Sequence, residues 1–182
     1  MATARQFQIF VCVIICAAIA GCTAKPYTVE PVTDFDVSRY TGTWYEIMRL
    51  DHRFERNLTN VTATYELLED GGLLVTNRGF NRNSCKWKTV TGKAAFQQDA
   101  DVGSLSVRFF WPFAAGYHVF ELDKEDYNWA VISGSNRRYL WILGREPSMP
   151  DALKQHLIRK ARADGFATDK LIKVDQGPVT CG

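Results

Sequence analysis

Short segments that alternate between apolar and polar residues constrain the fold of this chain most. Between residues 42 and 144, runs rich in Val, Thr, Tyr, Phe and Trp are separated by turn clusters about every ten residues. Asp70-Gly71-Gly72, between two such runs, is typical of a β-hairpin. Eight strands are therefore predicted, over residues 42–50, 60–68, 73–80, 86–96, 104–111, 117–123, 127–133 and 139–144.

A single helix is predicted after these strands. Met149, Leu153, Leu157 and Ala161 recur at intervals of four, which gives one apolar stripe suited to packing on a sheet. Ser148 to Asp151 has the spacing of a capping box, with Pro150 in the first turn, and Gly165 stands where a helix commonly ends. A short last strand is predicted over residues 171–174.

Eight successive strands followed by one helix favour a closed barrel over a sandwich, because closure removes exposed strand edges. The predicted fold class is all-β, an eight-stranded antiparallel up-and-down barrel with one C-terminal α-helix. A barrel of eight strands has an interior wide enough for one small ligand.

The N-terminus predicts export. Residues 9–20 are continuously apolar, and as a helix they would reach about 18 Å, too short for a hydrocarbon core of about 30 Å. Ile19-Ala20-Gly21 presents small residues to a signal peptidase, and Cys22 follows at once, which resembles the lipobox of bacterial lipoproteins. We therefore expect residues 1–21 to be a signal peptide and Cys22 to be acylated. An ordinary secretory signal cut at another bond is the alternative.

The remaining chain divides into two parts. Residues 22–36 contain two prolines and are predicted to be an extended tether, and residues 37–182 form one domain. The 22 Lys and Arg residues and 20 Asp and Glu residues are mixed along the chain without a basic block, which argues against a nucleic-acid partner.

The five cysteines sort by position. Cys12 and Cys16 fall in the predicted signal peptide and Cys22 is the predicted anchor. In an oxidising compartment, a Cys85–Cys181 disulfide is the simplest pairing of the other two; two free buried thiols are the alternative. No Cys or His spacing is typical of a metal site, and no nucleophile elbow or phosphate loop is present, so we expect no metal, no cofactor and no catalytic residues.

Three motifs resemble those of the lipocalin family over about residues 30–175. Gly42-Thr43-Trp44 resembles the G-x-W signature, Glu125-Asp126-Tyr127 the second motif with Glu in place of Thr, and the segment 139–145 the third, which ends in Arg145. The stretch 42–57 is similar to the bacterial outer-membrane lipocalins in particular. The resemblance implies structural roles for Gly42, Trp44, Asp126 and Arg145, with Arg145 lying over the Trp44 indole at the closed end of the barrel.

The inward residues follow from the two-residue period of a strand. If Arg145 points inward, so do Leu143, Trp141 and Tyr139. On the sixth strand we expect His118, Phe120 and Leu122 to face inward, since Glu121 and Asp123 lie on the other face. The predicted cavity-lining, ligand-binding residues are Ala63, Tyr65, Val107, Phe109, His118, Phe120, Tyr139 and Trp141. Such a lining suits an acyl chain with a polar head near the mouth; a filled barrel is the alternative.

The resemblance implies a lipid-anchored binding protein at the bacterial outer membrane that stores or transports fatty acids or lysophospholipids for envelope maintenance. Thr23, rather than an aspartate, follows Cys22, which in bacterial lipoproteins implies the outer membrane. Other functions remain open. One is an enzyme acting on a lipid through an interior thiol or acid/base pair; another is a ligand-free interaction protein or a carrier of another hydrophobe such as a haem or pigment.

Overall fold

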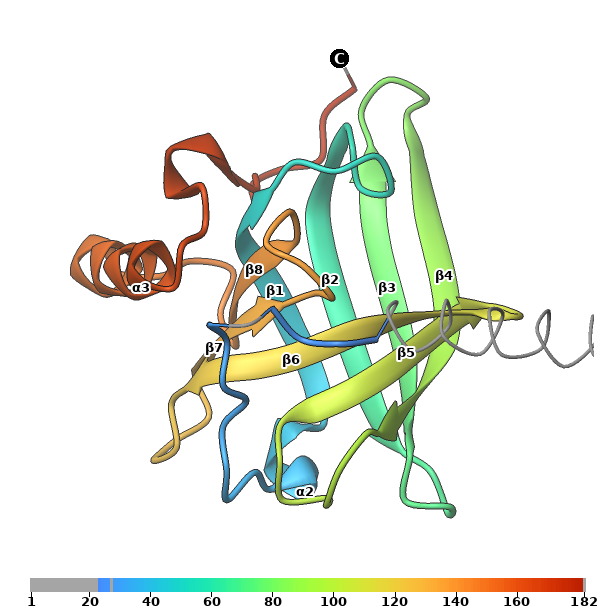
Figure 1. The fold of residues 1–182 in the computed structure, drawn as a ribbon. Helices are drawn as coiled ribbons and strands as arrows, with labels where there is room; N and C mark the ends of the chain where they lie inside the picture. Colours follow the sequence, from blue (N-terminus) through green and yellow to red (C-terminus); the bar gives the residue numbers. More distant parts are fainter. Residues whose placement is uncertain (1–22, 27, 182) are drawn as a thin grey trace, which may run out of the picture.

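The computed structural model describes residues 23–26 and 28–181, and its strands form one antiparallel sheet that closes on itself (Figure 1). The strand order is β2-β3-β4-β5-β6-β7-β8-β1-β9, and β2 also pairs with β1. The predicted eight-stranded up-and-down barrel is confirmed, with β9 added at the edge of β1. The strands are β1 Gly42–Leu50, β2 Leu58–Leu67, β3 Leu73–Asn81, β4 Lys86–Phe96, β5 Ser104–Phe110, β6 Phe113–Leu122, β7 Trp129–Ser133, β8 Leu140–Gly144 and β9 Leu171–Lys173.

Helix α3, Asp151–Ala163, lies against the outside of the barrel (Figure 1). Leu157 and Ala161 of the predicted stripe are fully buried in an outer core with Ile142 and other outward residues. The predicted capping box is wrong: Pro150 is the N-cap and makes no side-chain hydrogen bond. The 3-10 helix η1, Thr168–Lys170, leads from α3 towards β9. No helix among the described residues has the length and apolarity needed to cross a membrane.

The closed end of the barrel is built around Trp44 and Arg145. The short helix α2, Val37–Tyr40, precedes β1, and Gly42 follows with φ of +90°, a conformation that favours glycine. The Arg145 guanidinium lies 3.9 Å from the centre of the Trp44 ring, so the predicted contact is present. Its nitrogens also donate to the carbonyls of Arg39, Thr43 and Tyr127. The backbone N–H of Asp126 donates to the Asp123 carboxylate, and the Asp126 side chain itself is exposed.

The N-terminal segment is packed on the barrel. Val29 is fully buried. The Val32 N–H donates to the Val119 carbonyl and the Phe35 N–H donates to the Asp101 carbonyl, both at 2.8 Å. The prediction of an extended tether over residues 22–36 is therefore wrong for its described part, because Val29, Val32 and Phe35 find partners on the wall. The predicted signal peptide and Cys22 lie outside the described residues.

The C-terminal tail completes the wall. β1 pairs with β2 only from Gly42 to Tyr45, and beyond that point the two strands separate. The Gln176 side chain bridges the gap by donating to the Glu46 and Val61 carbonyls at 2.8 and 2.9 Å. Cys181 is disulfide-bonded to Cys85, as predicted, which ties the tail to the β3–β4 turn.

Candidate functional site

The barrel encloses a cavity of about 100 Å³. Five of the predicted residues line it: Ala63, Tyr65, Val107, Phe109 and Trp141. Four further apolar residues complete the apolar surface: Val61, Val75, Ala115 and Leu143. The polar lining comes from Glu46, Glu55, Thr62, Asn77 and Tyr117. The site is therefore an apolar chamber with a small number of hydrogen-bonding groups, which is the usual character of a small-molecule pocket.

Two predicted lining residues on β6, His118 and Phe120, face outward instead. The His118 ring is buried with its nitrogens 3.1 Å from Ser104 Oγ and 3.1 Å from the Thr23 carbonyl. Burial lowers the pKa of this imidazole. The Phe120 ring stacks on Phe166, 5.6 Å away, in the outer core beneath α3.

A β-bulge explains the error on β6. The pairing with β7 shifts between Val119 and Glu121, so the alternation reverses there. Glu121 faces outward, as predicted, and pairs with Lys160 of α3 at 2.7 Å, whereas Leu122 belongs to the interior core. On the other side of the bulge, Tyr117 faces inward in place of His118.

Tyr139, the remaining predicted residue, precedes β8 and does not line the cavity. Its ring stacks on Trp141 with centroids 6.1 Å apart and lies 5.4 Å from His52. It therefore packs beside a lining residue without lining the cavity itself.

Three buried tyrosine hydroxyls meet at one side of the chamber. Tyr117 lies between Tyr40 and Tyr65, with oxygen–oxygen distances of 2.6 and 2.7 Å. Burial raises the pKa of all three hydroxyls, so at neutral pH they remain neutral hydrogen-bonding groups. They supply polar contacts without charge.

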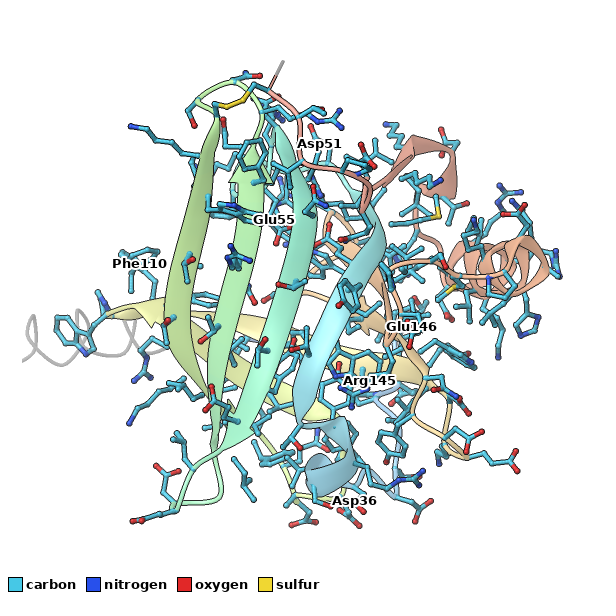
Figure 2. The ribbon with its side chains drawn as sticks, turned by 180° about the vertical axis from the view of Figure 1, so that it is seen from behind. Asp36, Asp51, Glu55, Phe110, Arg145 and Glu146 are labelled. Carbon is cyan, nitrogen blue, oxygen red and sulfur yellow. A yellow bond between two sulfur atoms is a disulfide. The ribbon has the colours of Figure 1, made fainter. Side chains whose placement is uncertain are left out.

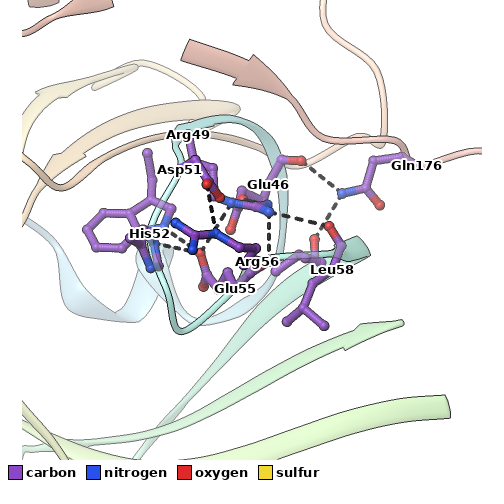
Figure 3. A network of polar contacts seen from close by, with 10 residues as sticks. Glu46, Arg49, Asp51, His52, Glu55, Arg56, Leu58 and Gln176 are labelled. Atoms are coloured by element: carbon purple, nitrogen blue, oxygen red, sulfur yellow. Dashed lines mark hydrogen bonds and ion pairs between the residues drawn. The ribbon is translucent and has the colours of Figure 1, made fainter. Parts of the chain in front are cut away.

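A buried ionic network forms the other polar part of the site (Figure 3). Arg49 Nη1 donates to Glu46 at 2.7 Å, and Arg49 Nη2 donates to the Glu55 carbonyl at 2.8 Å. The Glu55 carboxylate accepts from Trp141 Nε1 at 3.0 Å and lies 3.0 Å from His52 Nε2. Only Glu46 and Glu55 of these charged groups line the cavity.

Sequence reasoning did not identify this network. A shift in pairing between Glu46 and Met48 lets Glu46 and Arg49, three residues apart, both reach the interior. One signal was available in the sequence: Glu46 and Arg49 are opposite charges in a strand that is otherwise largely apolar. Because charged residues are seldom fully buried unless paired, two such charges on a buried strand indicate an ion pair.

The two carboxyl groups differ in their affinity for a proton. Burial, and then the charge of Glu55, hold the pKa of Glu46 well above its usual range. Burial also acts to raise the pKa of Glu55, but hydrogen bonding from His52 and Trp141 outweighs it and lowers that pKa. The network thus favours a neutral Glu46 beside an ionised Glu55, whose charge balances Arg49.

A family model described as a lipocalin-like domain matches residues 35–176. The chain belongs to the lipocalin family. Within residues 23–26 and 28–181, no group of three His, Cys, Asp or Glu side chains is placed to hold a metal ion. The family and the fold are those of binding and carrier proteins for hydrophobic ligands.

Bacterial relatives match nearly the whole chain. The outer membrane lipoprotein Blc of Vibrio cholerae is 44% identical over 90% of this chain and 96% of its own length. The protein of the same name from Escherichia coli K12 is 48% identical over 87% and 90%. The predicted location at the bacterial outer membrane is confirmed by these relatives. Among solved structures, insecticyanin from Manduca sexta shares the fold with a TM-score of 0.68 at 20% identity, over 87% of this chain and 90% of that one.

Proposed function

We propose that this lipocalin binds one single-chain amphiphile, a lysophospholipid or a fatty acid, and stores or transports it at the outer membrane for envelope maintenance. The apolar chamber with two carboxyl groups on its wall carries this proposal. An acyl chain would lie among Val61, Val107 and Leu143, where each buried CH₂ contributes about 0.8 kcal/mol.

The charged lining favours one head-group chemistry over the other. Glu55 is ionised and Glu46 is its neighbour, so a fatty-acid carboxylate placed there would meet like charge. A head group with an ammonium would instead pair with Glu55, and Trp141 offers an aromatic surface to the same cation. We therefore favour a lysophospholipid with an ammonium group over a free fatty acid.

Binding requires the chamber to expand. Its 100 Å³ is below the roughly 300–1,000 Å³ of pockets for drug-sized ligands. Phe109 is large and only half-buried, and unlike Trp141 it has no side-chain hydrogen bond to hold it, so it is the lining side chain best able to move.

The lipids that copurify with the protein from bacterial membranes test this function. Mass spectrometry should detect about one single-chain lipid per protein. Ala63→Phe fills the chamber and should reduce the bound lipid at least tenfold, whereas Leu67→Phe, on the same strand but 52% exposed, should retain it. Equal lipid content in both variants, or none in the parent, would overturn the proposal.

We also propose that Cys22 carries the membrane anchor. Acyl chains on the thiol together with an amide-linked lipid on the new N-terminus would exceed the two signals that stable anchoring requires. The intact mass of the protein from membranes should equal residues 22–182 plus the acyl groups. A mature chain that begins elsewhere, without added lipid, would contradict the anchor.

A further inference from the structure

The hairpin that joins β5 to β6 exposes three large aromatic side chains. Phe110, Trp111 and Phe113 are 70%, 84% and 75% exposed. The hairpin projects from the barrel on the side away from α3, and Phe110 lies at its end (Figures 1 and 2). Apolar groups gathered in this way at one tip indicate an interaction site rather than scattered surface residues.

Unpaired positive charge adjoins this hairpin. Lys93 on β4 and Arg108 on β5 are cross-strand partners, and both are exposed. Like charges directly opposite each other are unfavourable, and among the described residues neither side chain forms an ion pair or a hydrogen bond. The segments 71–98 and 102–120 together contain six Lys or Arg residues and no Asp or Glu, and of these six Arg82 pairs with Asp175. This side of the barrel is therefore complementary to an anionic partner.

The N-terminal segment brings the predicted anchor to the same place. The Thr23 carbonyl accepts from Gln97 Nε2 at 3.0 Å and lies 3.1 Å from His118 Nε2. A Cβ on Gly116 would stand 2.7 Å from this carbonyl, so the absence of a side chain permits the contact. Gly116 is three residues from Phe113, about 10 Å along the strand. Because Thr23 directly follows Cys22, a lipid on Cys22 would leave the fold beside the aromatic tip.

We propose that the β5–β6 hairpin is a second membrane contact, which inserts Phe110, Trp111 and Phe113 into the interface of a phospholipid bilayer containing anionic lipid. Aromatic rings are favoured at that depth, and basic residues near the surface add attraction to anionic head groups. A second copy of the chain fits the patch less well. Three aromatic residues of about 150–250 Å² each fall short of the roughly 800 Å² that each partner supplies to a standard interface.

This contact gives the proposed function a route for the ligand, and it rests on that function. Phe109, Ala115 and Tyr117 belong to the same two strands and line the chamber. The hairpin that touches the bilayer is thus also a wall of the ligand site. A lipid leaving the bilayer at the hairpin would reach the chamber without crossing bulk water.

Tryptophan quenching in the lipidated full-length protein tests the contact. The protein is reconstituted in vesicles of phosphatidylethanolamine and phosphatidylglycerol that include lipids brominated near the head group. We expect quenching, and we expect Trp111→Phe to remove most of it while keeping the apolar contact. Trp129→Phe is the matched control, since Trp129 lies on β7 and should not contribute. No loss of quenching in the Trp111 variant would overturn the proposal.

The charge contribution has its own control. Lys93→Gln with Arg108→Gln should reduce the quenching at least threefold in vesicles with phosphatidylglycerol and leave it unchanged in neutral phosphatidylcholine. Salt at 1 M should act like the double variant, because it shortens the Debye length to about 3 Å. The same loss in both kinds of vesicle would contradict the role of anionic lipid.

Two further measurements separate this proposal from others. The copurified lipid of Trp111→Phe should equal that of the parent, so the ligand site and the membrane contact can fail independently.

Cross-linking in vesicles addresses self-association. The membrane contact would be overturned by two results together: no quenching in the parent, and cross-linked parent dimers that disappear in the double variant Phe110→Ser with Phe113→Ser. The hairpin would then be assigned to contact with a second copy of the chain.

Discussion

At the scale of single residues, Glu46 places an ionisable group where solvent is nearly excluded. It is 3% exposed and contacts Arg49, with Glu55 nearby. Its pKa is raised in the folded protein. As pH rises above about 4.3, the unfolded chain releases a proton that the folded chain retains, so stability declines until the folded pKa is passed.

Glu46→Gln should therefore flatten the pH dependence of stability. Urea unfolding between pH 5 and 8 should show the parent losing free energy of unfolding with rising pH and the variant losing less. The lowered pKa of Glu55 acts in a separate range, because its contribution is lost as pH falls below the ordinary value. Glu66→Gln, at an exposed position on β2, is the control and should follow the parent. Parallel curves for the parent and the Glu46 variant would show that Glu46 is not responsible.

Arg145 has a structural role at the closed end. Arg145→Ala removes the contact with Trp44 and three hydrogen bonds to carbonyls, and should cost about 2 kcal/mol and lower Tm. The ratio of lipids bound should hardly change, since Arg145 does not line the chamber. Differential scanning calorimetry and lipid mass spectrometry measure the two effects. Arg159→Ala, exposed on α3, should alter neither, and changed selectivity at unchanged Tm would refute the assignment.

At the scale of elements, alternation located all eight strands but oriented them only where they are regular. On β2, Ala63 and Tyr65 lie where the pairing with β3 is continuous, and both face the cavity as their spacing predicts. On β1 and β6, pairing shifts reverse the alternation. For this reason the burial of Arg49 was not predicted, and His118 was predicted to face the cavity although it faces outward. A bulge depends on how two strands pair, and neither strand's own sequence records it. On β1 and β6, the orientation of the side chains could therefore not be predicted across the bulge.

The docked N-terminal segment gives a prediction at this scale. Val29→Ala removes two methyl groups from a fully buried site and should lower the free energy of unfolding by about 1–2 kcal/mol. Thr33→Ala, exposed in the same segment, should cost far less. Chemical denaturation distinguishes the two cases. Equal and negligible effects would mean that the segment is free in solution.

At the scale of the whole molecule, closure of the sheet joins residues that are distant in sequence. The family motifs and the late helix were sufficient to predict the barrel and the Trp44–Arg145 contact. The Glu55–Trp141 hydrogen bond joins positions 86 residues apart and depends on closure, so local patterns could not reveal it. Local patterns also could not reveal the role of Gln176, because its side chain bridges β1 and β2 where these two strands separate.

The disulfide is the clearest test of this long-range organisation. It joins residues 96 apart, and closing a loop of that length in the unfolded chain contributes up to about 4–5 kcal/mol on the chain-entropy model. Reduction should lower the free energy of unfolding by a large part of that amount and release the tail that carries Gln176. Cys85→Ser with Cys181→Ser should match the reduced parent and should not respond to dithiothreitol. If reduction left the parent's denaturation midpoint unchanged, the tail would be held by Gln176 and β9 alone, and the disulfide would contribute little to barrel closure.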